Sequence, residues 1–129
     1  MAKLMGIEAV VNKGKFYPAG PGVVKFDVVV LDPLTNNRVL RADAGDVTHK
    51  DVVGIVTDLF GDGRVLVEGT WGKRIYNAAW AWVRGQDLWL ALGTPGGLTA
   101  TPPHAGRLQR VAIANSPTEI TLLIDPVLQ

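Results

Sequence analysis

The chain has 129 residues, of which 47% are hydrophobic and 19% charged, and its formal net charge is +1. Such a composition is typical of one folded globular domain, and a near-neutral charge argues against a dedicated nucleic-acid binder. The absence of cysteine excludes disulfides and thiolate metal sites. No apolar run approaches the roughly 20 residues of a membrane span, and the N-terminus lacks the pattern of a signal peptide, so we expect neither membrane insertion nor export.

The first 22 residues carry no clear apolar period, and the stretch ends in residues 17–22, which hold two prolines and two glycines. This density disfavours both a helix and a central strand. We therefore predict an N-terminal arm over residues 1–22, with a short strand over residues 7–11, and a single β domain over residues 23–129. An arm of this kind orders against a partner. The alternative is an edge strand packed on its own domain.

From Val23 onward the pattern is that of strands with one buried face. Val24, Phe26, Val28 and Val30 share a face in the first of these strands. Further strands are predicted over residues 38–42, 52–57 and 64–68.

Glycine and asparagine mark the breaks between these strands. Asparagine tolerates positive φ, so residues 32–37 are predicted to form a turn. Asp62-Gly63 is a hairpin signal between two strand-like runs. Gly54 lies inside a strand-like run, which indicates a bulge or a close approach of two backbones. Residues 44–50 fit either a loop or one helical turn.

The C-terminal third repeats the alternation, since Leu88 to Leu92 and Ile120 to Ile124 each place their apolar side chains on one side of an extended chain. Residues 75–83 are ambiguous, because their alanines favour a helix and their tryptophans a strand. No segment shows a sustained helical period. Turn signals recur at the spacing of a sandwich or small barrel. We predict an all-β fold, either a compact β-tulip or small barrel, or a sandwich.

The inventory of catalytic groups is thin. Ser116 lies in a turn-forming segment without the strand and helix of a nucleophile elbow. His49 and Asp51 would share one side of an extended chain and could form a base, but a solvated pair before a strand is the simpler interpretation. His104 follows two prolines and is interpreted as a loop residue. The sequence predicts no catalytic residue, and therefore no enzyme.

Metal and phosphate sites are equally poorly supported. Two histidines without cysteine need carboxylate help to hold a metal, and no HExxH spacing is present. Residues 58–63 hold two acids and a glycine out of register with a calcium loop. The glycines at 93, 96 and 97 lack the following helix and lysine of a phosphate-binding loop. No metal and no cofactor is predicted.

Four tryptophans, Trp71, Trp80, Trp82 and Trp89, are the remaining distinctive feature. Trp80 and Trp82 would face the same way on a strand. Exposed aromatic rows stack on sugars or anchor protein interfaces. Core or subunit-interface positions are the commoner location for tryptophan.

The C-terminal pattern resembles a recurrent module of tailed-bacteriophage virion proteins, which is also seen in head-fibre and tail-fibre-like proteins. In that module a Trp–x–x–Gly–x–x–Leu-Tyr-Leu strand leads into a Gly-Leu-Thr–x–x–Pro-Pro turn, and a strand that ends in a small-residue Ala–x–Ser–x–Thr turn follows. The corresponding residues here are Trp82, Gly85, Leu88, Trp89 and Leu90, with Trp89 where the pattern usually has tyrosine, then residues 96–99, Pro102-Pro103, residues 106–118 and a terminal alternating strand.

The middle of the chain resembles the β-tulip core of lambdoid head decoration proteins, which are small trimeric proteins on the outer capsid shell. The matching elements, in order, are residues 28–31, the Asn36-Asn37 turn, residues 39–40, 52–55 and 65–67, and Gly69. The Trp-rich C-terminal part departs from the lambdoid pattern.

These resemblances imply a capsid decoration, or cement, protein that binds the major capsid protein on the outer surface of a virion and stabilises the head. They imply a homo-oligomer, in the lambdoid case a trimer, made in the host cytoplasm, with no nucleic-acid or membrane partner. The capsid contacts would then include Lys3, Lys13, Lys15, Phe16 and Tyr17. The second hypothesis is a fibre or host-recognition module that binds surface glycans through its tryptophans.

Overall fold

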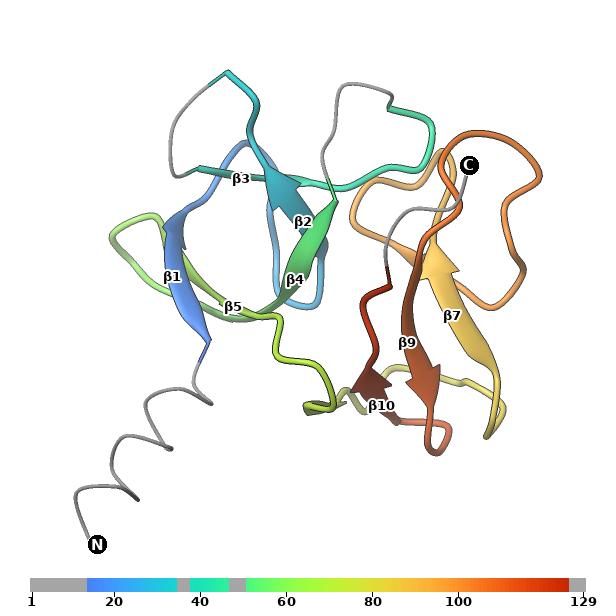
Figure 1. Cartoon of the computed structure of the whole chain (residues 1–129). Coiled ribbons are helices and arrows are strands. Elements are labelled where there is room, and N and C mark those ends of the chain that lie inside the picture. Colours follow the sequence, from blue (N-terminus) through green and yellow to red (C-terminus); the bar gives the residue numbers. More distant parts are fainter. Residues whose placement is uncertain (1–13, 35–37, 47–50, 126–129) are drawn as a thin grey trace, which may run out of the picture.

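The computed structural model describes residues 14–34, 38–46 and 51–125, and these form two antiparallel five-stranded sheets packed against each other (Figure 1). The predicted all-β fold is confirmed, in its sandwich form rather than as a closed barrel. The strands are β1 (Lys15–Pro18), β2 (Val28–Leu31), β3 (Val39–Arg41), β4 (Val52–Leu59), β5 (Arg64–Glu68), β6 (Arg74–Tyr76), β7 (Asp87–Leu90), β8 (Leu98–Thr99), β9 (Arg110–Ala114) and β10 (Glu119–Leu122).

The first sheet, in the order β1-β5-β4-β2-β3, is strongly curled. Its two edge strands approach each other, because Ala19, just after β1, forms a parallel bridge with Val39 of β3. Five valines lie buried within the curl, and Tyr17 packs against them. These valines are Val29, Val39, Val56, Val65 and Val67.

The register of the first sheet shifts at Gly54, where β2 pairs with β4 across a bulge. A Cβ at Gly54 would overlap the carbonyl oxygen of Glu68 on β5, so the two backbones meet where only glycine fits. Both features predicted for this glycine are confirmed. The predicted hairpin at Asp62-Gly63 is also present, joining β4 to β5, with the Phe60 N–H donating to the Arg64 carbonyl at 3.0 Å.

The second sheet, in the order β6-β10-β9-β7-β8, shows the predicted alternation. Leu88 and Leu90 on β7, and Ile120 and Leu122 on β10, are fully buried. The alternation predicted over Leu88 to Leu92 ends earlier than expected, because Leu92 lies beyond the end of β7 and is exposed.

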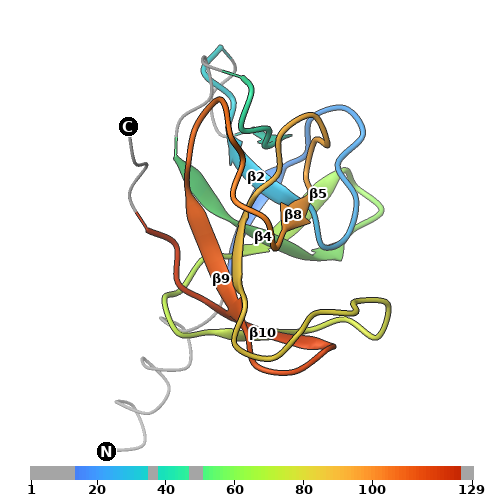
Figure 2. The same ribbon diagram turned by 90° about the vertical axis from the view of Figure 1, so that its right-hand side faces the viewer.

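The main core lies between the sheets, where Val28, Val30 and Ile55 of the first meet the leucines and isoleucines of the second. Figure 2 shows the second sheet in front, with β2, β4 and β5 behind it. Backbone hydrogen bonds join the two halves of the fold. The Val28 N–H donates to the Gly96 carbonyl at 2.9 Å, and the Gly96 N–H donates to the Ala42 carbonyl at 2.8 Å.

The strand predicted to start at Val23 begins instead at Val28. The Asp27 carboxylate accepts a hydrogen bond from the Val24 N–H at 2.8 Å, and the Asp27 N–H donates to the Val24 carbonyl at 3.1 Å. This local turn competes with an extended chain. As a result Val24 is half exposed, so its expected shared face with Val28 is wrong, and Phe26 has a φ of 72° outside the strand but still packs against the core cluster that contains Val28 and Val30.

Residues 75–83 are neither a helix nor one strand. The strand β6 ends at Tyr76, and the Asn77 side chain accepts a hydrogen bond from the Ala79 N–H at 2.9 Å. This asparagine-centred turn ends the strand and leads into an irregular segment.

Part of the predicted arm belongs to the first sheet. Residues 15–18 form β1, which pairs with β5 from Lys15↔Val67 to Pro18↔Arg64, and the Ala19 N–H donates to the Gly63 carbonyl at 3.0 Å. The short strand predicted over residues 7–11 lies outside the described residues, as do Lys3, Lys13 and His49.

Candidate functional site

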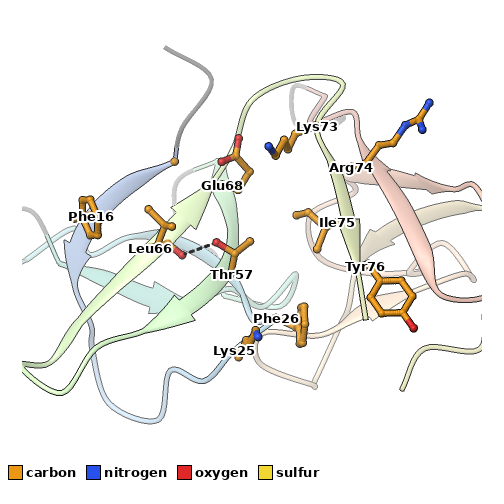
Figure 3. A pocket seen from close by; sticks show the side chains of 11 residues that line it. Phe16, Lys25, Phe26, Thr57, Leu66, Glu68, Lys73, Arg74, Ile75 and Tyr76 are labelled. Atoms are coloured by element: carbon orange, nitrogen blue, oxygen red, sulfur yellow. Dashed lines mark hydrogen bonds between the residues drawn. The ribbon is translucent and has the colours of Figure 1, made fainter. Parts of the chain in front are cut away.

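A mainly apolar cleft with a volume of about 510 Å³ lies between the two sheets. It lies where the outer face of β1 and β5 extends beyond the cover of the second sheet, and β6 forms the opposite wall (Figure 3). Phe16 and Leu66 line the first wall, Ile75 the second, and Phe26 lies between them.

Phe16 belongs to an exposed aromatic cluster at the outer end of this cleft. Its side chain points out of the first sheet and is 54% exposed. Its ring lies 5.4 Å from that of Phe60, and the Arg64 guanidinium lies 5.3 Å from the Phe16 ring and 6.0 Å from the Phe60 ring. Two tilted rings in contact with an arginine over them form a preorganised contact surface, because the side chains are held before any partner arrives.

Phe26 is held in the left-handed region by its backbone and its neighbours. Its N–H donates to the Val56 carbonyl at 2.7 Å, and its ring packs against Trp80 with the centroids 5.4 Å apart. The Lys25 ammonium lies 5.2 Å from the same ring. A positive φ is unfavourable for a bulky residue, so these contacts maintain the ring beside the cleft.

Glu68, the last residue of β5, contributes a buried carboxylate to the cleft. The residue is 4% exposed, and its Oε1 atom has no hydrogen-bond partner among the described residues. Figure 3 shows the Lys73 amine directed toward Glu68, but no ion pair links the two. A buried carboxylate oxygen without a donor is costly, so this atom can accept a hydrogen bond from a bound molecule.

Of the residues predicted as partner contacts, the structure places three. Lys15 and Phe16 are exposed on β1, and Phe16 lines the cleft. Tyr17 points the other way and packs inside the curl of the first sheet. The alternation of a strand thus separates Phe16 from Lys15 and Tyr17, which together line a different hollow.

The four tryptophans do not form a row. Trp71 is 70% exposed in the turn between β5 and β6. Trp80 and Trp82 are partly buried against the main core, with their rings 6.2 Å apart. Trp89 is half buried on β7. Trp71 alone of the four presents most of its surface to solvent.

The remaining polar candidates have structural roles or stand apart. The Ser116 Oγ accepts hydrogen bonds from the N–H groups of Thr118 and Glu119, at 3.3 and 3.1 Å, which closes the β9–β10 turn. The exposed Asp51 forms an ion pair with Arg107 at 3.5 Å. His104 is exposed in a loop.

Within the described ranges, no three histidine, aspartate or glutamate side chains gather as metal ligands would. The same ranges contain no helix with the length and hydropathy needed to cross a membrane.

Sequence reasoning missed the cleft and most of its polar residues, Glu68, Lys25, Lys73 and Arg74. The signal for Glu68 was a charged residue directly after the alternating Val65 and Val67, at the end of a predicted strand. That signal does not show which strand lies opposite, and the opposite wall is formed by β6 from another sheet.

Scans against protein-family models, curated proteins and solved structures each found no match to this chain.

Proposed function

We propose that this chain is a structural virion protein that binds the outer surface of a tailed-phage capsid and stabilises it as a decoration protein. The resemblance of residues 23–126 to phage virion modules motivates the proposal. The observation that carries it is Phe16, a half-exposed aromatic residue on the edge strand β1, whose ring packs against that of Phe60. Exposed aromatic anchors next to an arginine are typical of protein-binding surfaces.

In this proposal the major capsid protein contacts Lys15 and Phe16, and the preceding lysines, Lys3 and Lys13, add to the same interface. The protein acts as a homo-oligomer, a trimer as in lambdoid decoration proteins, so that several weak contacts add through avidity. It has no catalytic role and no nucleic-acid or membrane partner, and it is made in the host cytoplasm before it joins the virion.

Co-sedimentation with capsids that lack the protein tests the proposal. We expect Phe16→Ser to weaken capsid binding by about tenfold or more, which corresponds to the loss of one anchor. Val83→Ser, at another exposed apolar residue, is the matched control and should bind normally. Unchanged binding of the Phe16 variant, or no binding by the unaltered protein, would contradict the proposal. Light scattering gives the oligomeric state.

Deletion of residues 1–13 tests the arm. The deletion stops before Lys15 because removing β1 would also remove Tyr17 from the interior of the first sheet. We expect the shortened protein to keep its thermal unfolding transition and to lose capsid binding. Normal capsid binding would show that the first 13 residues play no part.

The second candidate function, a glycan-binding module of a fibre or host-recognition protein, is favoured by the exposure of Trp71. An exposed indole can stack on a sugar ring. In this case Trp71→Ala abolishes binding to host-surface glycans, Trp71→Phe retains part of it, and capsid binding is unaffected by either change.

A further inference from the structure

We infer that the cleft between β5 and β6 is a docking site for an extended segment of a partner protein with alternating apolar and acidic side chains, which adds as a strand to the free edge of β6. This inference goes beyond capsid binding and stands on the cleft alone. Its support comes from the backbone of β6, the apolar walls and the charges around them.

The strand β6 lies at one end of the second sheet, and among the described strands it pairs only with β10. The Leu122 N–H donates to the Lys73 carbonyl at 2.8 Å, and the Asn77 N–H donates to the Thr118 carbonyl at 2.9 Å. Backbone groups alternate in direction along an antiparallel strand, so those of Arg74 and Tyr76 face away from β10. These groups are available to an added strand.

The cleft follows this edge, because Lys73, Arg74, Ile75 and Tyr76 all line it. Figure 3 shows Ile75 directed into the cleft and Arg74 and Tyr76 on the other side of β6. Since the side chains of an added strand also alternate, one set would enter the cleft toward Phe16. The other set would lie beside Arg74 and Tyr76. An added strand would therefore place its alternate side chains in two different environments, the cleft and the surface beside Arg74 and Tyr76.

The charges indicate which side chains each environment accepts. Lys25, Lys73 and Arg74 are exposed, and none forms an ion pair with another residue of the ranges 14–34, 38–46 and 51–125. Their uncompensated charge favours acidic residues at the rim and beside Arg74. Inside the cleft, apolar walls favour Leu or Phe. The partnerless Oε1 of Glu68 favours a hydroxyl or amide donor and disfavours an acid at that depth.

The test uses the full-length protein and short fluorescein-labelled peptides, with binding followed by fluorescence anisotropy. The first peptide alternates Leu and Phe with Asp, Glu and Thr. The second replaces its acidic residues by Lys, and the third carries N-methyl groups on the amides that an added strand would use. We expect the first peptide to bind and both others to bind about tenfold or more weakly, because each lacks one of the two proposed interactions.

Two variants locate the site. Arg74→Glu should weaken binding of the acidic peptide by about tenfold and improve binding of the lysine peptide. Arg84→Glu is the matched control and should bind as the unaltered protein does, because it makes an equal charge change at another exposed arginine that has no ion pair with a described residue. Amide NMR shifts on binding should be largest at Arg74 and Tyr76.

Equal binding of the acidic and lysine peptides, equal loss in both variants, or no binding of any peptide would overturn the inference. Lys73 and Arg74 would then act as charges that protect a short edge strand from pairing. Such a failure leaves the capsid test with Phe16→Ser unaffected, since that test measures binding to a different probe.

Discussion

The two sheets bury their strands in different ways. In the first sheet Val28, Val29 and Val30 are all completely buried, because the sheet curls around one set of valines and packs its outer face on the second sheet. In the second sheet β7 and β10 bury every other residue. A continuous apolar run therefore marks a strand covered on both faces, whereas alternation marks a strand covered on one.

The curl of the first sheet also forces backbones together. At the start of β4 and the end of β5, Gly54 lies against the Glu68 carbonyl and Gly69 lies against the Val53 carbonyl. Within the second sheet, by contrast, the core is made by side chains, which have some freedom to repack. The first sheet should therefore tolerate least change at these two glycines.

The largest expected effect is that of Gly69→Ala. Its Cβ would overlap the Val53 carbonyl oxygen. The oxygen is a backbone atom and the Cβ is fixed to the backbone, so no side-chain rotation can remove the overlap and the two strands would have to separate. We expect the free energy of unfolding to fall by about 4 kcal/mol or more, measured by urea denaturation. Gly61→Ala is the control, since nothing lies within 4 Å of a Cβ there. A Gly69 variant as stable as the Gly61 variant would contradict the close packing of the curl.

The second prediction compares the two faces of β2. Val29 packs inside the curl and Val30 packs between the sheets. We expect Val29→Ala and Val30→Ala each to lower the free energy of unfolding by about 2 kcal/mol, through lost burial and the cavity left behind. If the side chains inside the curl were not closely packed, the free energy of unfolding of the Val29 variant would fall by less than about 0.5 kcal/mol. A fall of that size is expected for a change at the half-exposed Val24.

The same two variants test whether the sheets unfold together. All four tryptophans lie between residues 71 and 89, so tryptophan fluorescence reports on the second half of the chain, whereas circular dichroism reports on both sheets. The hydrogen bonds from Val28 and Gly96 across the sheets predict one transition for both probes. A Val29 variant that shifts only the circular dichroism transition would show that the sheets unfold separately.

Sequence reasoning predicted what depends on local patterns. The alternation at Leu88 and Ile120, the hairpin at Asp62-Gly63 and the special role of Gly54 each follow from a few neighbouring residues. The all-β class follows from the same patterns.

What sequence reasoning could not predict depends on contacts between distant segments. The cleft joins Phe16 and Glu68 of one sheet to Ile75 of the other, and no local pattern pairs these strands. The late start of β2 had a local cause, the Asp27 turn, but the valine alternation concealed it. Tyr17 and Phe16 were predicted to act together although neighbouring residues on a strand point to opposite faces.

The smallest predicted effect concerns Asp27, which is buried at the start of β2. Burial raises the pKa of this carboxyl, against the opposing effects of the Val24 hydrogen bond and the Arg41 charge 3.2 Å away. The folded state therefore holds the proton more tightly than the unfolded state. The resulting stabilisation is present below pH 3.8 and is lost as the pH rises through the raised pKa. Asp27→Asn retains an acceptor for the Val24 N–H and removes this titration.

We therefore expect the stability of the unaltered protein, relative to the Asp27→Asn variant, to fall as the pH rises from 3 toward 7 in urea denaturation. Asp62→Asn is the control with the opposite sign, because hydrogen bonds from Arg64 lower the pKa of the exposed Asp62. Its stabilisation is present above pH 3.8 and is lost as the pH falls. If the stability difference from the unaltered protein changed with pH in the same direction for both variants, Asp27 would be solvated like Asp62. The start of β2 would then be open to water rather than held by the buried turn.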